Sequence, residues 1–279
     1  MKLGVTVLLF LAFILAGTQP PNARESSCPS TIKNSAPLLQ PGAVILLGEM
    51  HGTQESPLFL RDLVCLALEQ DLAVTVGLEI PDAETPRLEA YLASEGDSAA
   101  VAHLVAGDFW HRPAQDGRSS AVMLRLIEGF RFTRTYGAPL NVLYLDAAAT
   151  VNRDSVMATR LYNAIQEAPS DVFITLTGNI HNRLTVGTQW NAAYEPMGYL
   201  LLRTLFNHPI YALDVAYTGG EAWVCFGSQA SDCGVQQLKG NAEQGDGIVV
   251  DDENPAYSGR YYVNTLTASR PIFEPGDSQ

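Results

Sequence analysis

The sequence predicts an α/β protein with a three-layer α/β/α arrangement, a mainly parallel sheet and a C-terminal hairpin extension. Short apolar runs typical of strands buried on both faces alternate with longer segments of helical periodicity. The stretches between successive runs are long enough for the helical crossovers that parallel strands require. Polar residues follow directly after several of these runs, where strands would leave the sheet. Together these patterns are typical of repeated βαβ units.

The composition indicates a globular chain. It has 279 residues, of which 47% are apolar and 17% charged, enough to bury a full core. We expect a single domain over residues 24–279, with its core at about residues 40–217. The formal charge is −13, and the acidic residues are scattered along the chain. This argues against nucleic acid or an anionic membrane as partner and favours a small-molecule or peptide substrate.

The first 23 residues resemble a secretory signal peptide. Lys2 supplies one positive charge, and an apolar run from Leu3 to Ala16 follows before the sequence becomes polar. This run is short for a membrane-spanning helix. We therefore expect export, cleavage between Ala16 and Ala23, a secreted or periplasmic location, and no stable membrane insertion after cleavage.

Export gives the four cysteines a structural interpretation, because exported proteins meet an oxidising environment. Cys225 and Cys233 flank a short polar loop that could close a hairpin, and we expect them to form a disulfide. Cys28 and Cys65 would then tie the early mature chain to the first helix. Their spacing does not match a zinc site.

Buried strands are expected at five places, and helices between them. The predicted strands are residues 43–47, 74–79, 140–145, 171–177 and 210–217. The predicted helices are residues 56–70, one or two within 82–107, 120–137, 154–166 and 197–205. Residues 109–113 are expected to form an aromatic loop, 221–226 a hairpin arm, 234–257 a mobile excursion, and 260–266 a last strand.

Acidic and imidazole side chains follow the predicted strands. Glu49 and His51 come directly after the first strand, Glu79 ends the second, Asp146 follows the third, and His181 comes shortly after the fourth. The carboxyl ends of parallel strands meet at one edge of a sheet, where ligands of α/β proteins bind. The sequence therefore predicts a shared site at this edge.

Two Gly-x-x-His tetrapeptides and a strand-end glutamate resemble a known superfamily. Gly48-Glu49-Met50-His51, Leu78-Glu79 and Gly178-Asn179-Ile180-His181 are similar to the ChaN and Tiki superfamily, which also includes erythromycin esterases. The resemblance covers about residues 40–217 and implies a three-layer α/β fold. Its members include haem-binding uptake proteins, metal-dependent proteases and ester hydrolases. The Glu-x-His spacing is similar to the ChaN branch, whereas erythromycin esterases have one more residue between the glutamate and the histidine.

The mechanism we expect is hydrolysis by an activated water. His51 is the expected general base, because imidazole titrates near neutral pH, with Glu49 or Glu79 orienting it. His181 would polarise the substrate or protonate the leaving group. In a metal-assisted version, His51, Glu79 and His181 hold a divalent metal that has an open position for water.

Four further residues are assigned to substrate binding. Arg118 follows a flexible turn at the start of a helix and could hold an anionic or carbonyl group; a solvated arginine is the equal alternative. Asp116 accompanies it, or caps the helix. Trp110 could line the pocket or simply pack, and Asn179 belongs to the second tetrapeptide.

The alternative function is haem binding without chemistry. The resemblance to ChaN implies a histidine or tyrosine as axial ligand, on a surface that a second subunit of a homodimer completes. A third interpretation is a protein that keeps the cluster only for stability. Serine, cysteine and phosphate-loop motifs are absent from the sequence.

Overall fold

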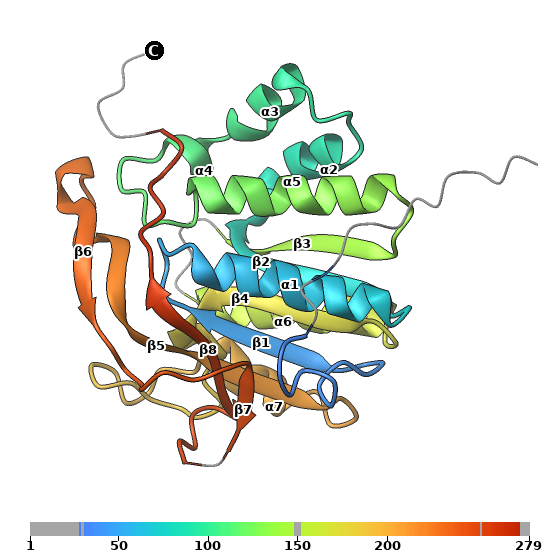
Figure 1. Ribbon diagram of the computed structural model, residues 1–279, viewed down its shortest axis with the longest axis vertical. Helices are drawn as coiled ribbons and strands as arrows, with labels where there is room; N and C mark the ends of the chain where they lie inside the picture. The colour runs from blue at the N-terminus through green and yellow to red at the C-terminus, as the bar shows by residue number, and fades with distance from the viewer. Residues whose placement is uncertain (1–27, 29–30, 148–151, 252, 274–279) are drawn as a thin grey trace, which may run out of the picture.

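One mainly parallel sheet organises the protein. The computed structural model describes residue 28 and residues 31–147, 152–251 and 253–273. Seven strands follow one another in the order β3-β2-β4-β1-β5-β8-β7, and β6 pairs with β5 (Figure 1). The first five strands in the chain and β8 run parallel, while β6 and β7 pair antiparallel with β5 and β8. The predicted fold class is confirmed, and the C-terminal extension contains an antiparallel β7–β8 pair.

The element bounds follow the predicted alternation. The strands are β1 Val44–Glu49, β2 Val74–Pro81, β3 Leu140–Asp146, β4 Val172–Gly178, β5 Ile210–Cys225, β6 Cys233–Lys239, β7 Ile248–Val250 and β8 Gly259–Leu266. The α-helices are α1 Glu55–Glu69, α2 Thr85–Leu92, α3 Ser98–Val105, α4 Asp108–His111, α5 Ala121–Thr135, α6 Arg153–Glu167 and α7 Met197–Leu202. Three short 3₁₀ segments are η1 Asp82–Glu84, η2 Asn179–Asn182 and η3 Ala230–Asp232.

The structure differs from expectation in three places. Residues 108–111 form the short helix α4, not a loop. The expected hairpin arm does pair antiparallel with β6, but it is the second half of β5, which continues through Gly219 and Gly220 as one 16-residue strand. Residues 234–257 include most of β6 and all of β7. The glycine and acidic residues in this segment hid its alternation, because pairing with β5 and β8 determines these strands more than local propensity does.

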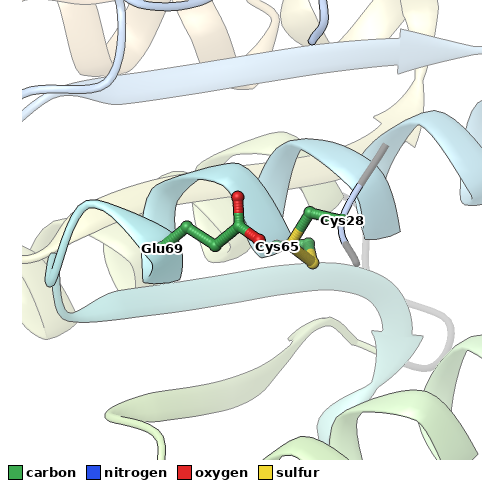
Figure 2. A group of neighbouring side chains, drawn as sticks. All are labelled: Cys28, Cys65 and Glu69. Atoms are coloured by element: carbon green, nitrogen blue, oxygen red, sulfur yellow. A yellow bond between two sulfur atoms is a disulfide. The ribbon is translucent and has the colours of Figure 1, made fainter. Parts of the chain in front are cut away.

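Both predicted disulfides are present. Cys28 is joined to Cys65 on α1, so the start of the described chain is fastened to a helix that covers the sheet (Figure 2). Cys225 is joined to Cys233 at the turn between β5 and β6. Disulfides are typical of proteins in oxidising compartments. The predicted signal peptide, residues 1–23, lies outside the described residues, and among those described no helix is long and apolar enough to cross a bilayer.

Loss of the Cys28–Cys65 bridge is expected to destabilise the protein by about 3 kcal/mol, because the cysteines are 37 residues apart and the bridge restricts the unfolded chain. The Cys28→Ser/Cys65→Ser double variant should unfold at correspondingly lower urea concentration. The Cys225–Cys233 bridge closes a loop of only 8 residues, so the Cys225→Ser/Cys233→Ser variant should lose less stability. Equal losses in the two variants would contradict this explanation.

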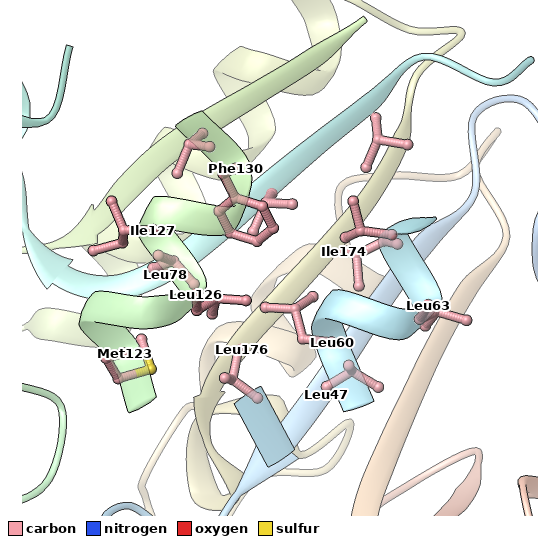
Figure 3. Close-up of a cluster of buried hydrophobic side chains, with 14 of the residues drawn as sticks. Leu47, Leu60, Leu63, Leu78, Met123, Leu126, Ile127, Phe130, Ile174 and Leu176 are labelled. Atoms are coloured by element: carbon pink, nitrogen blue, oxygen red, sulfur yellow. The ribbon is translucent and has the colours of Figure 1, made fainter. Parts of the chain in front are cut away.

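Helices cover both faces of the sheet. On one face, α1 and α5 pack on alternate residues of β1, β2 and β4, as the labelled side chains in Figure 3 show. On the other face, α6 and α7 pack on Val44, Leu46 and Phe173. Since β1 is buried on both faces along its whole length, its sequence has no polar position before Glu49. The first residues free to carry chemistry are therefore those at its carboxyl end.

Candidate active site

The two Gly-x-x-His segments lie side by side. β1 and β4 are parallel neighbours, and their register places Glu49 opposite Gly178. A side chain on Gly48 would meet the Cα of Asn179 at 2.8 Å, and one on Gly178 would meet Nε2 of His51 at 3.0 Å. Each glycine therefore allows the other segment to approach closely. This gives the repeated tetrapeptide a physical reason that its sequence alone did not supply.

Glu79 lies at the centre of the cluster. Its Oε2 accepts the backbone N–H of Gly178 at 2.7 Å and lies 3.3 Å from Nε2 of His51. Its Oε1 accepts Arg118 at 3.0 Å and Arg153 at 2.7 Å and lies 3.7 Å from Nε2 of His181. The side chain is 3% exposed. Burial alone would raise the pKa of Glu79, but attraction to His51 and Arg118 lowers it well below the ordinary value, so the carboxylate is ionised at neutral pH.

Both ring nitrogens of His51 face carboxylates. Nδ1 lies 2.8 Å from Oε1 of Glu49, and Nε2 faces Glu79. Burial alone would lower the pKa of His51, but the attraction of Glu79 and then of Glu49 outweighs it and raises the pKa from 6.5 to about 10. The ring is therefore an imidazolium at neutral pH. In this arrangement it has no free lone pair with which to accept a proton from water.

The charge on His51 predicts how stability depends on pH. Its pKa in the folded protein lies above the unfolded value, so the stabilisation is complete below pH 6.5 and is lost as pH rises through about 10. Since the side chain is 23% exposed, we expect a loss on the order of 2 kcal/mol. Urea unfolding between pH 6 and 10 should show it in the wild type and not in His51→Gln. Parallel curves for the two proteins would contradict it.

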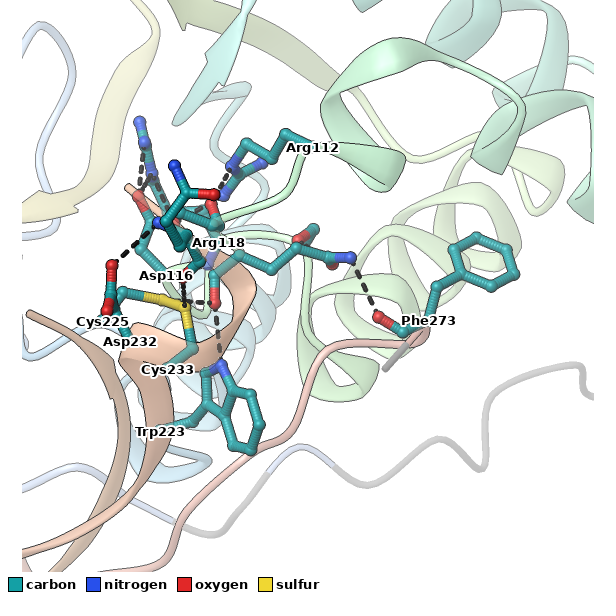
Figure 4. The surroundings of a disulfide bond; sticks show 12 residues. Arg112, Asp116, Arg118, Trp223, Cys225, Asp232, Cys233 and Phe273 are labelled. Carbon is teal, nitrogen blue, oxygen red and sulfur yellow. Dashed lines mark hydrogen bonds and ion pairs between the residues drawn. A yellow bond between two sulfur atoms is a disulfide. The ribbon is translucent and has the colours of Figure 1, made fainter. Parts of the chain in front are cut away.

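Arg118 is brought to the cluster by a long-range contact that the sequence does not reveal. A side chain on Gly117, whose φ is +92°, would meet the backbone N of Gly52 at 2.2 Å, so the segment before α5 lies directly on the turn after His51. Trp223 Nε1 donates to the carbonyl of Gln115 at 2.7 Å, which holds this segment against β5. Figure 4 shows Trp223 and the Cys225–Cys233 disulfide beside Asp116 and Arg118.

The guanidinium of Arg118 is fully engaged by acids. It donates to Asp116 through Nε and one terminal nitrogen, and to Glu79 and Asp146 through the other. Asp116 also accepts Arg112, and attraction to the two arginines outweighs burial to lower the pKa of the Asp116 carboxyl. The predicted pair, Asp116 and Arg118, thus belongs to the cluster, where Arg118 neutralises Glu79.

Arg153 is a member of the cluster that the sequence analysis missed. It is the first residue of α6, and its guanidinium bridges Glu79 and Asp146 at 2.7 Å each, with a further bond of 2.8 Å to Asp146. Its side chain is 32% exposed, more than those of Arg118 and His51. A cation next to the predicted start of this helix was visible in the sequence, but the orientation of α6 was not.

His181 has partners of its own, also missed from the sequence. Its Nδ1 lies 2.8 Å from Oδ1 of Asp154. Tyr194 donates to Oδ2 of the same carboxylate at 2.7 Å, and the backbone N–H of Met197 donates to Oδ1 at 2.8 Å. Asp154 was expected only as the start of a helix. Its role depends on α6, η2 and the segment before α7 coming together, which local sequence does not indicate.

Trp110 and Asn179, the other two residues predicted to bind substrate, lie in the core and at the sheet edge respectively. Trp110 is 0% exposed and belongs to the hydrophobic core beside Phe109, so in this conformation it offers no surface to a ligand. Asn179 lies at the sheet edge, where its amide donates to Asp214 at 3.1 Å and its carbonyl accepts the hydroxyl of Tyr257. Asn179 therefore connects the cluster to β5.

The donor set of the metal-assisted version fits a divalent cation poorly. Glu79, its one carboxylate, already pairs with Arg118 and Arg153, and the imidazolium of His51 adds a third positive charge. A divalent cation would have to enter among these charges. Among the described residues, the one group of three ligand atoms within 4.8 Å of one another is Cys28, Cys65 and Glu69, and its cysteines form a disulfide.

Comparison with known proteins places the fold. No family model matches the chain, and no curated protein matches it in sequence. Among solved structures, a mutant erythromycin esterase in its open conformation is similar, with a TM-score of 0.60, 13% identity and coverage of 86% of this chain and 94% of that one. A succinoglycan biosynthesis protein has a TM-score of 0.64 at 9% identity, covering 85% and 91%. A Bacillus cereus protein has a TM-score of 0.57 at 9% identity, covering 86% and 93%.

The predicted resemblance is thus confirmed at the level of the fold. The chain shares the fold of an erythromycin esterase, over nearly the full length of both chains. Identities near 10% say nothing of substrate, because one fold supports many activities.

Proposed function

We propose that this protein is an exported hydrolase that activates water at the carboxyl edge of its sheet and acts on an ester or peptide-like substrate. The observation that supports this most is the convergence of His51, His181 and Glu79 from three separate strand ends, with both imidazoles facing one ionised carboxylate. Acid–base chemistry needs neighbouring groups that can donate and accept a proton, and two imidazoles beside a carboxylate are groups of this kind. The fold shared with an esterase supports the same reaction class.

The cluster is well suited to stabilise a developing oxyanion. Attack of water on an acyl carbon moves negative charge onto the carbonyl oxygen, and fixed positive groups lower the energy of that state. Arg153 and the imidazolium of His51 retain 32% and 23% side-chain exposure, so a substrate oxygen can approach them. Glu79 and Asp146 hold these cations in place before the substrate arrives. An uncharged ester or amide carbonyl fits this arrangement.

Metal assistance and haem binding are the competing interpretations of the same residues. Bound metal would supply a more acidic water, and His51, Glu79 and His181 would have to release their present partners to hold it. Haem would require a histidine nitrogen free to act as an axial ligand. Nε2 of His51 lies 3.3 Å from Glu79, whereas Nε2 of His181 lies 3.7 Å from it and is the less engaged of the two. The present ion pairs of Glu79 therefore favour hydrolysis without a metal, and absorbance analysis tests the haem interpretation.

The decisive experiment is elemental and absorbance analysis of the purified protein, followed by a screen of aryl esters, alkyl esters and peptides. We expect hydrolysis that chelators leave unchanged and that falls about a hundredfold in His51→Ala. The matched control is His103→Ala, since His103 lies on α3 outside the cluster.

Three results would count against the proposal. Activity that disappears with chelation and returns with a divalent ion would establish the metal-assisted version. A haem absorption band that is lost in the His51→Ala/His181→Ala variant, without hydrolysis, would establish the carrier. No response from any substrate, together with lower thermal stability of His51→Ala, would leave a structural role for the cluster.

A further inference from the structure

The two histidines of the cluster differ in how closely Nε2 of each ring approaches Glu79. Nε2 of His51 lies 3.3 Å from Oε2 of Glu79. Nε2 of His181 lies 3.7 Å from the other oxygen of Glu79, too far for a hydrogen bond. Of the two rings, His181 therefore has the less engaged Nε2. The choice between the two rings rests on the proposed hydrolysis, because it concerns which ring takes the proton from the attacking water.

Nδ1 of His181 is held by Asp154, whose carboxylate has two further hydrogen-bond donors around it. The carboxylate of Asp154 accepts Tyr194 and the backbone N–H of Met197 in addition to facing Nδ1 of His181. Residue Asp154 is 7% exposed. This geometry makes the carboxylate the acceptor of the Tyr194 hydroxyl, the Met197 N–H and Nδ1 of His181. Nδ1 of His181 must then carry a hydrogen.

Tyr194 independently requires the same proton position. Its hydroxyl has one hydrogen, which it donates to Oδ2 of Asp154 at 2.7 Å, while its oxygen lies 3.2 Å from Nδ1 of His181. Burial and the bond to Asp154 raise the pKa of Tyr194, so the hydroxyl keeps its hydrogen. With that hydrogen committed to Asp154, the oxygen can only accept from Nδ1.

We propose that His181 is the general base of this site and that Asp154, supported by Tyr194, is its positioning residue. Together they hold the neutral ring with hydrogen on Nδ1 and a lone pair on Nε2. Nε2 takes a proton from water as the water oxygen bonds to the acyl carbon and the carbonyl π electrons move to oxygen. When that electron pair returns, the bond to the leaving oxygen breaks, and His181 passes the proton to it. Ester and water thus become acid and alcohol, and the base is regenerated.

The test compares wild type with Asp154→Asn, whose amide can donate to Nδ1 and so favour the opposite tautomer. Nitrogen-15 NMR of the neutral histidine rings reports which nitrogen carries hydrogen, and His181→Gln assigns the signals. We expect hydrogen on Nδ1 in wild type and on Nε2 in Asp154→Asn. With p-nitrophenyl acetate, kcat should fall about 10³ to 10⁴-fold while KM changes little. Asp62→Asn is the control, because among the described residues the ion-pair partner of Asp62 is its exposed neighbour Arg61.

Each outcome decides the proposal. Hydrogen on Nε2 of His181 in wild type would overturn it, and so would an unchanged kcat in a folded Asp154→Asn. If Asp154→Asn does not fold, the wild-type tautomer still decides, and Tyr194→Phe should keep hydrogen on Nδ1 with at most a tenfold fall in kcat. If wild type hydrolyses no ester but has the expected tautomer, hydrolysis is wrong and the positioning by Asp154 stands.

Discussion

Replacing Glu79 with glutamine is expected to lower the free energy of unfolding by about 3 to 5 kcal/mol and to abolish hydrolysis. The carboxylate is 3% exposed and its Oε1 pairs with both Arg118 and Arg153. A glutamine amide has one oxygen and one NH₂ group. Whichever way it is turned, the NH₂ group faces donors: either the two guanidiniums, or the N–H of Gly178 and Nε2 of His51. Buried positive charges would then lack their partner.

Urea unfolding and the ester assay measure the two effects in one preparation. The matched control is Glu89→Gln, because Glu89 pairs with Arg134 at 3.3 Å and its side chain is 46% exposed. An exposed pair of this kind contributes less than about 1 kcal/mol, so this variant should behave as wild type. Equal unfolding midpoints for Glu79→Gln and Glu89→Gln would show that Glu79 does not organise the cluster.

The acidic and imidazole members of the site were predictable because the strands that carry them are parallel. Glu49, Glu79, Asp146 and the second tetrapeptide each follow a buried run, and neighbouring parallel strands bring their carboxyl ends to one edge. Side-chain burial on both faces of β1 excluded polar residues until Glu49. The strand order was not visible in the sequence. Its placement of β4 between β2 and β1 is what brings Glu79 next to both tetrapeptides.

The arginines and the partners of His181 were not predictable, because they depend on how helices and loops meet. Arg153 and Asp154 are adjacent on α6, yet one binds Glu79 and the other binds His181. That division follows from the position of α6 on the sheet, which burial of its apolar face determines. The position of Trp110 in the core was not predictable for a related reason. A short aromatic segment has no periodicity that would distinguish a core residue from a pocket residue.

The Gly178→Ala variant is expected to fold normally and to lose hydrolysis. Its backbone, with φ −52° and ψ 137°, suits alanine, so stability should be unchanged or rise by about 0.5 kcal/mol. The added methyl would lie 3.0 Å from Nε2 of His51, 3.5 Å from Oε2 of Glu79 and 3.6 Å from Cδ2 of His181. It would therefore occupy the space between the acid–base groups. A displacement of about 1 Å at such a site costs roughly a hundredfold in rate, and the occupied space adds to that loss.

Two other glycines make this prediction specific. Gly48→Ala would place its methyl 2.8 Å from the Cα of Asn179, a backbone clash that should destabilise the protein by about 1 to 3 kcal/mol. Gly129→Ala, in α5, meets nothing within 4 Å and should raise helix stability by about 1 kcal/mol without affecting rate. Of the three variants, Gly178→Ala alone should therefore lose rate in the ester assay without losing stability in urea unfolding. Full activity there would mean that the reaction takes place away from the space bounded by His51, Glu79 and His181.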